Sequence, residues 1–284
     1  MKKLLVFLFM LSMMTFSSVY SYGEFNRPEV FTSGEWLYTV QEDETVEIHR
    51  YKGKSAYVTI PEELDGKTVS SIGIGAFSLA VNMMIVNIPD SITHIDANPF
   101  ICPDNNLETI YVSDTHPYLG VINGVLFSKP DKRLISCSSG LKLESYSVPE
   151  GVKIIGTLAF QDCSTLKEVE LPSSVTSIEN SAFQGCSSLK KVNLPEGITS
   201  MGDYVFKSCS SLENVTLPTS LTSIGRSAFD ECYSLKMLTI PRNVTRIDGV
   251  LSPLNPILVN VDKYSYAAQY CKELGYPYVD WLLE

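Results

Sequence analysis

Two sets of side chains in this sequence are of types that could do chemistry. Four cysteines recur at a fixed interval of 23 residues: Cys163, Cys186, Cys209 and Cys232. Two carboxylates, Glu168 and Glu170, have the i, i+2 spacing that places both on one face of a β-strand. Thiols can form disulfides or bind a metal, and a carboxylate pair can hydrolyse a glycoside.

The cysteines are better explained as core residues. Each lies three residues after a phenylalanine that recurs with the same step, and Ala80 occupies the equivalent position in an earlier unit. A site that accepts Ala or Cys requires a small buried side chain, and a buried free cysteine behaves as one. Disulfides between neighbouring units remain an alternative, although the total of seven cysteines excludes complete pairing within the chain.

Metal and cofactor sites are not indicated. A step of 23 residues differs from the ligand spacings of zinc sites, and His49, His94 and His116 fall at unrelated positions of the pattern. We therefore predict no metal and no cofactor.

The carboxylate pair is better explained as a solvated face. Glu168 and Glu170 would lie on an open sheet where nothing excludes water or shifts the pKa of either group, as glycoside hydrolysis requires. The chain also contains no GxSxG, no HExxH and no phosphate-cradling glycine loop. We predict no catalytic residues and no enzymatic activity.

The elements that position these residues form a repeat. The phrase "SAFQGCSSLKKVNLP" returns in related forms with a step of 23 residues, marked by Leu171-Pro172, Leu194-Pro195, Leu217-Pro218 and Ile240-Pro241. A fixed period of this length is typical of a solenoid, in which each unit buries the apolar face that its neighbour exposes. Within one unit, apolar and polar residues alternate as in a short β-strand that proline ends. The fold class is therefore a β-rich solenoid of about nine stacked coils.

Insertions interrupt the amino-terminal half. The step from Ile60-Pro61 to Ile88-Pro89 is 28 residues, because "ELDGK" is inserted. The step from Val112 to Val148 is 36 residues instead of 23, and the extra residues include "GVLFSKPDKRLIS". In this segment two apolar stretches flank the turn residues Lys129–Lys132. The pattern predicts an inserted β-hairpin near residues 121–138 that protrudes from the solenoid.

Both ends require caps, because a terminal coil would expose its core and strand edge. Alternating segments from Trp36 to Val40 and from Thr45 to Tyr51 predict an amino-terminal β-hairpin cap. A short helix from Ser265 to Leu274, ended by Gly275, predicts a carboxy-terminal helical cap. The expected organisation is a signal peptide over 1–21, a hairpin cap over 22–56, the solenoid over 57–261 and a cap over 262–284.

The amino terminus, "MKKLLVFLFMLSMMTFSSVYS", has the three-part layout of a secretory signal, with cleavage expected after Ser21. A membrane anchor is the alternative, but the apolar run is short for a bilayer span, and no later run is long enough. Cleavage would remove Lys2 and Lys3 and leave 20 basic against 32 acidic residues, a net charge of −12. Such a charge opposes binding to nucleic acid.

The pattern "L..V.LP..VTSI...AF..C.SL", the "NGVLFSKPDKRLI" segment and the "SYAAQYCKELGYPY" segment resemble the BspA-like leucine-rich-repeat family, from about Thr32 to Tyr278. The resemblance implies a right-handed leucine-rich-repeat coil in a secreted or cell-surface bacterial protein. The best-known members of that family are adhesins for host matrix proteins or other cells. An extracellular protein or glycan, with host matrix proteins as one class, is the partner that the resemblance implies.

A candidate binding site follows from aligning the outward strand positions. Tyr57, Ile85 and Tyr111 fall on three successive strands, where polar residues are expected. In the alternative, one of the two hairpins covers this patch as core. We predict a secreted, monomeric, non-enzymatic binding module; the alternative is a structural spacer or display scaffold without a partner.

Overall fold

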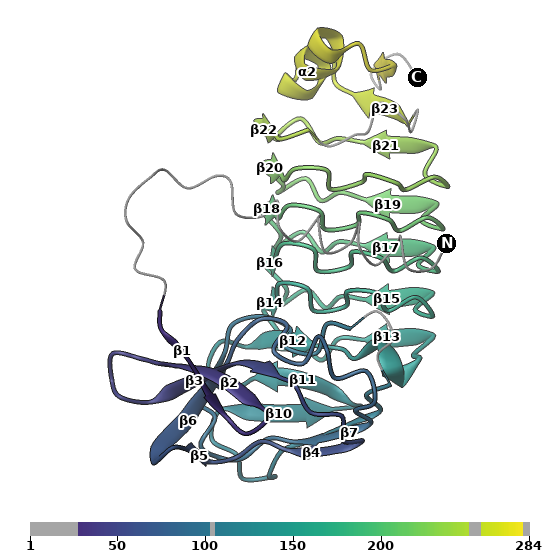
Figure 1. Ribbon diagram of the computed structural model, residues 1–284. Coiled ribbons are helices and arrows are strands. Elements are labelled where there is room, and N and C mark those ends of the chain that lie inside the picture. The colour runs from purple at the N-terminus through teal and green to yellow at the C-terminus, as the bar shows by residue number, and fades with distance from the viewer. Residues whose placement is uncertain (1–27, 103–105, 250–256, 281–284) are drawn as a thin grey trace, which may run out of the picture.

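The computed structural model describes residues 28–102, 106–249 and 257–280. Within these ranges the chain forms a solenoid of stacked coils, confirming the predicted fold class (Figure 1). The predicted signal peptide, residues 1–21, lies outside the described residues.

One side of the solenoid is a ladder of short parallel strands. Its three sheets hold three, four and three strands. The strands are β4 (Tyr57–Thr59), β7 (Ile85–Asn87), β9 (Thr109–Tyr111), β13 (Ser145–Ser147), β15 (Glu168–Glu170), β17 (Lys191–Asn193), β19 (Asn214–Thr216), β21 (Met237–Thr239), β23 (Leu258–Val261) and β24 (Tyr278–Asp280). The last strand follows the terminal helix, which accounts for one more ladder strand than the nine coils expected.

The other strand-bearing side consists of two-residue strands in parallel register. These are β14 (Ile154–Ile155), β16 (Ser177–Ile178), β18 (Ser200–Met201), β20 (Ser223–Ile224) and β22 (Arg246–Ile247), which continue a sheet formed by β10 (Leu119–Ile122), β11 (Val125–Ser128) and β12 (Arg133–Ser136). In the amino-terminal half, β1 (Val30–Ser33), β2 (Trp36–Val40), β3 (Val46–Tyr51), β5 (Glu63–Leu64), β6 (Lys67–Ile72) and β8 (His94–Ile95) form a separate sheet.

A stack of phenylalanines runs through the core of the carboxy-terminal half. Phe160, Phe183, Phe206 and Phe229 are fully buried, and successive ring centroids lie 5.0, 5.4 and 5.6 Å apart. The rings are nearly parallel, because each occupies the same position of its coil. The phenylalanines are therefore packing residues.

The inserted hairpin does not protrude, so that prediction was wrong. All four residues of β11 are buried, and its alternate side chains enter two different cores. Val125 and Phe127 pack into the carboxy-terminal core, whereas Leu126 packs into the amino-terminal core. Strand β12 continues directly into the solenoid by parallel pairing with β14. The hairpin is therefore a layer of the solenoid, because both of its faces are apolar.

The two halves meet without an intervening layer at one corner. Asn98 donates its backbone N–H to the carbonyl of Thr157 (3.3 Å) and its Nδ2 to the carbonyl of Leu158 (2.9 Å), 60 positions further along the chain. At this corner the two coils abut, whereas elsewhere the hairpin separates the cores. The insertion is therefore wedge-shaped, and the strands of the amino-terminal half lie obliquely to those of the other half (Figure 1).

Both ends of the solenoid are capped as the fold class requires. At the amino terminus β2 and β3 pair antiparallel, and an additional strand, β1, pairs with β2. At the carboxy terminus the helix α2 (Tyr266–Leu274) begins after Ser265, whose hydroxyl accepts the N–H of Ala268. It ends at Gly275, whose φ of 72° gives the left-handed C-cap that glycine favours. Ala267, Ala268 and Cys271 face the last coil and close the core.

Candidate binding surface

The N-terminal ladder face comprises the outward side chains of β4, β7 and β9. The central residue of each strand, Val58, Val86 or Ile110, is buried in the core. Because successive side chains of a strand point to opposite faces, the flanking residues must point outward. The inward apolar residue of each coil thus fixes which side chains this face presents.

The predicted site residues lie on this face. Tyr57 is 70% exposed and Tyr111 is 56% exposed, while Ile85 is half-buried. Tyr57 pairs directly with Ile85, and Tyr111 lies on the next strand, two positions beyond the partner of Ile85. Neither hairpin covers the two tyrosines, so the patch is an open surface. Its role in binding a partner stays a prediction.

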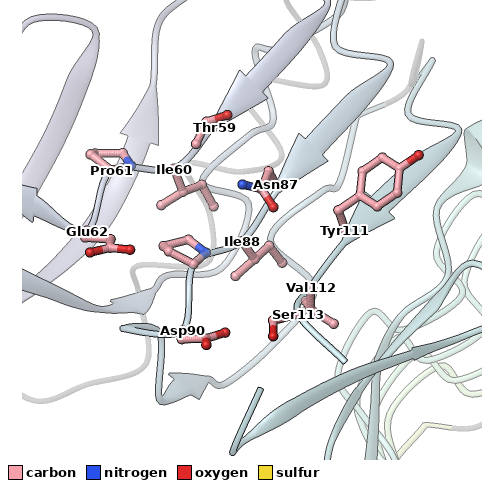
Figure 2. Close-up of a pocket in the computed structure, with 11 residues that line it drawn as sticks. Thr59, Ile60, Pro61, Glu62, Asn87, Ile88, Asp90, Tyr111, Val112 and Ser113 are labelled. Carbon is pink, nitrogen blue, oxygen red and sulfur yellow. The ribbon is translucent and has the colours of Figure 1, made fainter. Parts of the chain in front are cut away.

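A depression of about 610 Å³ adjoins the patch at the carboxyl ends of the three strands. Figure 2 shows Thr59, Asn87 and Tyr111 in a row across the strands, with Glu62 and Asp90 on the turns that follow β4 and β7. Sequence reasoning missed the two acids. The phrases "TIPEE" and "NIPDS" carried the signal, because each places an acid directly after the proline that ends an exposed strand.

A buried histidine, His116, is hydrogen-bonded to the backbone of Pro89, which lines this depression. The Nδ1 atom of His116 accepts the N–H groups of Tyr118 (3.2 Å) and Leu119 (3.1 Å). The proton is therefore on Nε2, which donates to the carbonyl of Pro89 (3.1 Å). The side chain of His116 is only 1% exposed, so its role here is structural. The turn that carries Asp90 is fixed in place before any partner arrives.

The carboxylate pair lies where the alternation predicts, on the outward side of β15. Glu170 accepts a hydrogen bond from Ser147 (2.6 Å), and the flanking strand contributes Lys191 to the same shallow depression of about 260 Å³. This surface is open and its charges are mixed. It offers no enclosed space in which a carboxyl group could be desolvated.

All seven cysteines are buried, and the four of the repeat column are thiols, as the core interpretation predicts of them. Within the repeat column, Sγ of Cys186, Cys209 and Cys232 each lies 3.1 Å from the carbonyl of a phenylalanine in the preceding coil. Burial raises the pKa of Cys186 well above its ordinary value and that of Cys232 to about 12. A thiol that stays protonated is a poor nucleophile and a poor metal ligand.

No metal centre is evident in the part of the chain that the structure describes, where no three His, Cys, Asp or Glu side chains are arranged to hold an ion. Over the same ranges, no helix has the length and apolar character that crossing a bilayer requires.

A third depression, of about 500 Å³, lies beside the corner where the two halves abut. Its lining includes Ile74 and Ile101 from one half and Leu158 and Gln161 from the other. No sequence pattern indicates this depression, because residues far apart in the chain form its two walls.

A family model for the BspA type leucine rich repeat region matches residues 51–128 and 136–250, in six copies. No curated protein matches the chain. The likeness to solved structures, by contrast, extends over most of its length.

A leucine rich cell surface protein from Faecalibacterium prausnitzii A2-165 is 29% identical (TM-score 0.44), and the match covers 83% of this chain and 55% of that one. The chain thus spans about half the length of that protein. A leucine-rich repeat protein from Bacteroides ovatus ATCC 8483 is 24% identical (TM-score 0.50), with 88% and 67% covered. The leucine rich repeat protein of T. pallidum is 21% identical (TM-score 0.33), with 88% and 98% covered. The likeness to the B. ovatus protein supports the fold.

Proposed function

Because this chain belongs to the BspA-type leucine-rich-repeat family, we propose that it is a secreted, non-enzymatic module that binds a protein or glycan outside the cell. The binding surface in this proposal is the N-terminal ladder face. The signal-like amino terminus supports export, and the membership supports a binding or display role.

The observation that carries the proposal is the exposure of Tyr57 and Tyr111 on one continuous face. Folding gains nothing from leaving such large rings in water, and contiguous exposed aromatic side chains mark interaction sites more often than random surface does. The equivalent positions of the next coils carry polar residues such as Glu168, Lys191 and Asn214. The aromatic character is thus confined to part of the ladder, which a uniform packing role would not require.

The test compares two variants of the processed protein. The double replacement Tyr57→Ser and Tyr111→Ser removes both rings, and Met237→Ser is the matched control. Met237 is a 49% exposed apolar residue at the other end of the same ladder. Each protein is immobilised and exposed to purified extracellular matrix proteins and to a glycan array. We expect the double variant to lose capture, with a change in the free energy of unfolding of only about 0.5 kcal/mol, and the control to keep it.

The alternative is a spacer that stacks and displays other parts of a larger protein. Side-chain hydrogen bonds along the ladder, such as Ser147 to Glu170 and Asn260 to Thr239, favour this alternative. They satisfy polar groups of the outward face without a binding partner. A wild-type protein that captures no matrix protein and no glycan would support the spacer. Capture that survives the loss of both tyrosines would place the binding surface elsewhere.

A further inference from the structure

The depression beside the aromatic patch carries negative charge without a counter-charge. Glu62 and Asp90 line it, and no lysine or arginine does. Both side chains are exposed, and neither has an ion pair or a side-chain hydrogen bond to any residue that the structure describes. Lys129, on the turn between β11 and β12, donates its ammonium to the carbonyl of His116 (2.6 Å) and pairs with neither acid.

Several acids elsewhere on the solenoid are engaged within the protein. Glu179 pairs with Arg133 and accepts from Thr157, and Glu196 accepts both the N–H and the hydroxyl of Thr219. Glu196 follows the strand-ending proline of its coil, as Glu62 does in its own. The acid that follows the strand-ending proline is therefore hydrogen-bonded within the protein in one coil (Glu196). In another coil (Glu62) its side chain has no partner among the described residues.

The two acids lie in register on successive coils. The N–H of Ile60 donates to the carbonyl of Asn87, and the N–H of Ile88 donates to that of Tyr111, so the chain stacks regularly where the strands end. Neighbouring strands are ~4.8 Å apart, which lets one planar guanidinium or one ammonium group reach both carboxylates. The exposed ring of Tyr111 borders the same space and provides a face on which a cation can stack.

We propose that the N-terminal ladder face binds a cationic segment of a partner protein. A lysine or arginine of that segment lies between Glu62 and Asp90, and neighbouring apolar side chains of the segment cover Tyr57 and Ile85. This assignment rests on the proposed function, because it uses the same face, and it adds the chemistry of the partner.

The negative charge of this face distinguishes between its three candidate partners: a second copy of the chain, a glycan and a protein segment. A second copy of this chain would bring the same two carboxylates and a net charge of −10 to the interface, so repulsion opposes self-association. A neutral glycan would stack on the tyrosines but would gain little from an uncompensated pair of acids. A cationic protein segment satisfies both the aromatic and the acidic groups.

The first experiment selects peptides from a random display library on the wild-type protein. The library is first depleted on the variant Glu62→Gln, Asp90→Asn, which keeps the shape of the depression and removes its charge. We expect the selected peptides to be enriched in arginine or lysine next to aromatic or aliphatic residues. Selection of neutral or acidic peptides, or of none, would overturn the proposal.

The second experiment measures one selected peptide quantitatively by fluorescence anisotropy. Replacing its central arginine with citrulline, which has nearly the same shape and no charge, should weaken binding about tenfold. The charge-free double variant should weaken it to the same extent, and added salt should reduce the difference. Glu150→Gln is the matched control, since Glu150 also follows a strand-ending proline but lies beyond the hairpin, outside the depression.

The outcomes separate this inference from the proposed function. If citrulline and arginine peptides bind equally but binding requires Tyr57 and Tyr111, the face is a binding site and the cationic assignment is wrong. Capture of glycans that ignores Glu62 and Asp90 would have the same meaning. If binding survives in the tyrosine variant, the proposed function itself is wrong.

Discussion

At the scale of single residues, the repeat decides the role of each side chain by its position in the coil. Phenylalanine and cysteine recur at buried positions of four successive coils in the carboxy-terminal half, and both are core residues. Tyr57 and Tyr111 lie at outward positions where other coils carry polar residues, and both are exposed. In this fold, the position of a reactive residue within the coil therefore decides whether it is buried. That has to be established before a chemical role is assigned to it.

Phe206→Ala removes the third ring of the phenylalanine stack, between Phe183 and Phe229. The ring is fully buried, with neighbouring centroids at 5.4 and 5.6 Å, so its loss leaves a cavity that adjacent coils cannot fill. We expect the free energy of unfolding in urea to fall by about 3–5 kcal/mol. Asn214→Ala, on the exposed side of β19, serves as the control. A loss below about 1 kcal/mol for Phe206→Ala would contradict the stacked core.

The buried thiols predict a pH dependence. The folded state raises the pKa of Cys186 and Cys232, so both keep their protons where an unfolded thiol, with a pKa of about 8.5, loses its own. The stabilisation they provide is complete below pH 8.5 and is lost as the pH rises toward 12, because the unfolded state then binds fewer protons than the folded state.

The measurement is the melting temperature between about pH 7 and pH 10 for the wild type and for Cys186→Ala, Cys232→Ala. Alanine is the residue at the equivalent position of an earlier coil, so the variant should fold. We expect the wild-type melting temperature to fall more steeply above pH 8.5 than that of the variant. Equal slopes would show that these thiols ionise as freely in the folded state as in the unfolded state.

At the scale of elements, the inserted hairpin is the part of the fold that changes most with tertiary context. A hairpin with one apolar face would lie on the surface, whereas β11 is buried on both faces between two cores. It therefore links the two halves of the solenoid instead of standing out from them.

Leu126→Ala tests the buried position of the hairpin. Its side chain is fully buried in the amino-terminal core, so we expect the free energy of unfolding to fall by about 2–5 kcal/mol. Ile122 lies in the same hairpin but is 45% exposed, and Ile122→Ala should change it by only about 0.5 kcal/mol. Similar small losses of unfolding free energy for both substitutions, measured by denaturant unfolding, would contradict the buried position of the hairpin.

At the scale of the whole molecule, the wedge-shaped insertion divides one continuous solenoid into two obliquely set halves. The aromatic patch and its acids lie on the ladder of the first half, and the regular polar ladder forms the second. Each free end of the stack needs a cap, because the solenoid exposes a core cross-section wherever it stops. We therefore expect the caps to prevent the ends of the stack from pairing with other chains.

Ala267→Glu places a charge where α2 packs on the last coil, since Ala267 is fully buried. We expect the helix to detach and the exposed strand edge to associate with other copies, seen as a larger mass in size-exclusion chromatography with light scattering. Tyr266→Glu introduces the same charge at the start of the same helix, on an exposed side chain, and should leave a monomer. A monomeric, stable Ala267→Glu variant would mean that the helix is not a necessary cap.

The sequence by itself determined the solenoid, the inward and outward positions of each strand, and both caps, whereas only the structure showed that no hairpin covers Tyr57 and Tyr111. The features that the sequence determined depend on the 23-residue period and on the alternation of apolar and polar residues, both of which can be read from the sequence alone. The continuous apolar character of "VLF" in β11 was the available sign of burial on both faces, but a hairpin turn beside it favoured the wrong interpretation. Only the tertiary structure placed the hairpin between two cores and Asn98 against Leu158. It alone left Glu62 and Asp90 without partners, because ion pairs and packing between residues far apart in the sequence depend on which coils become neighbours.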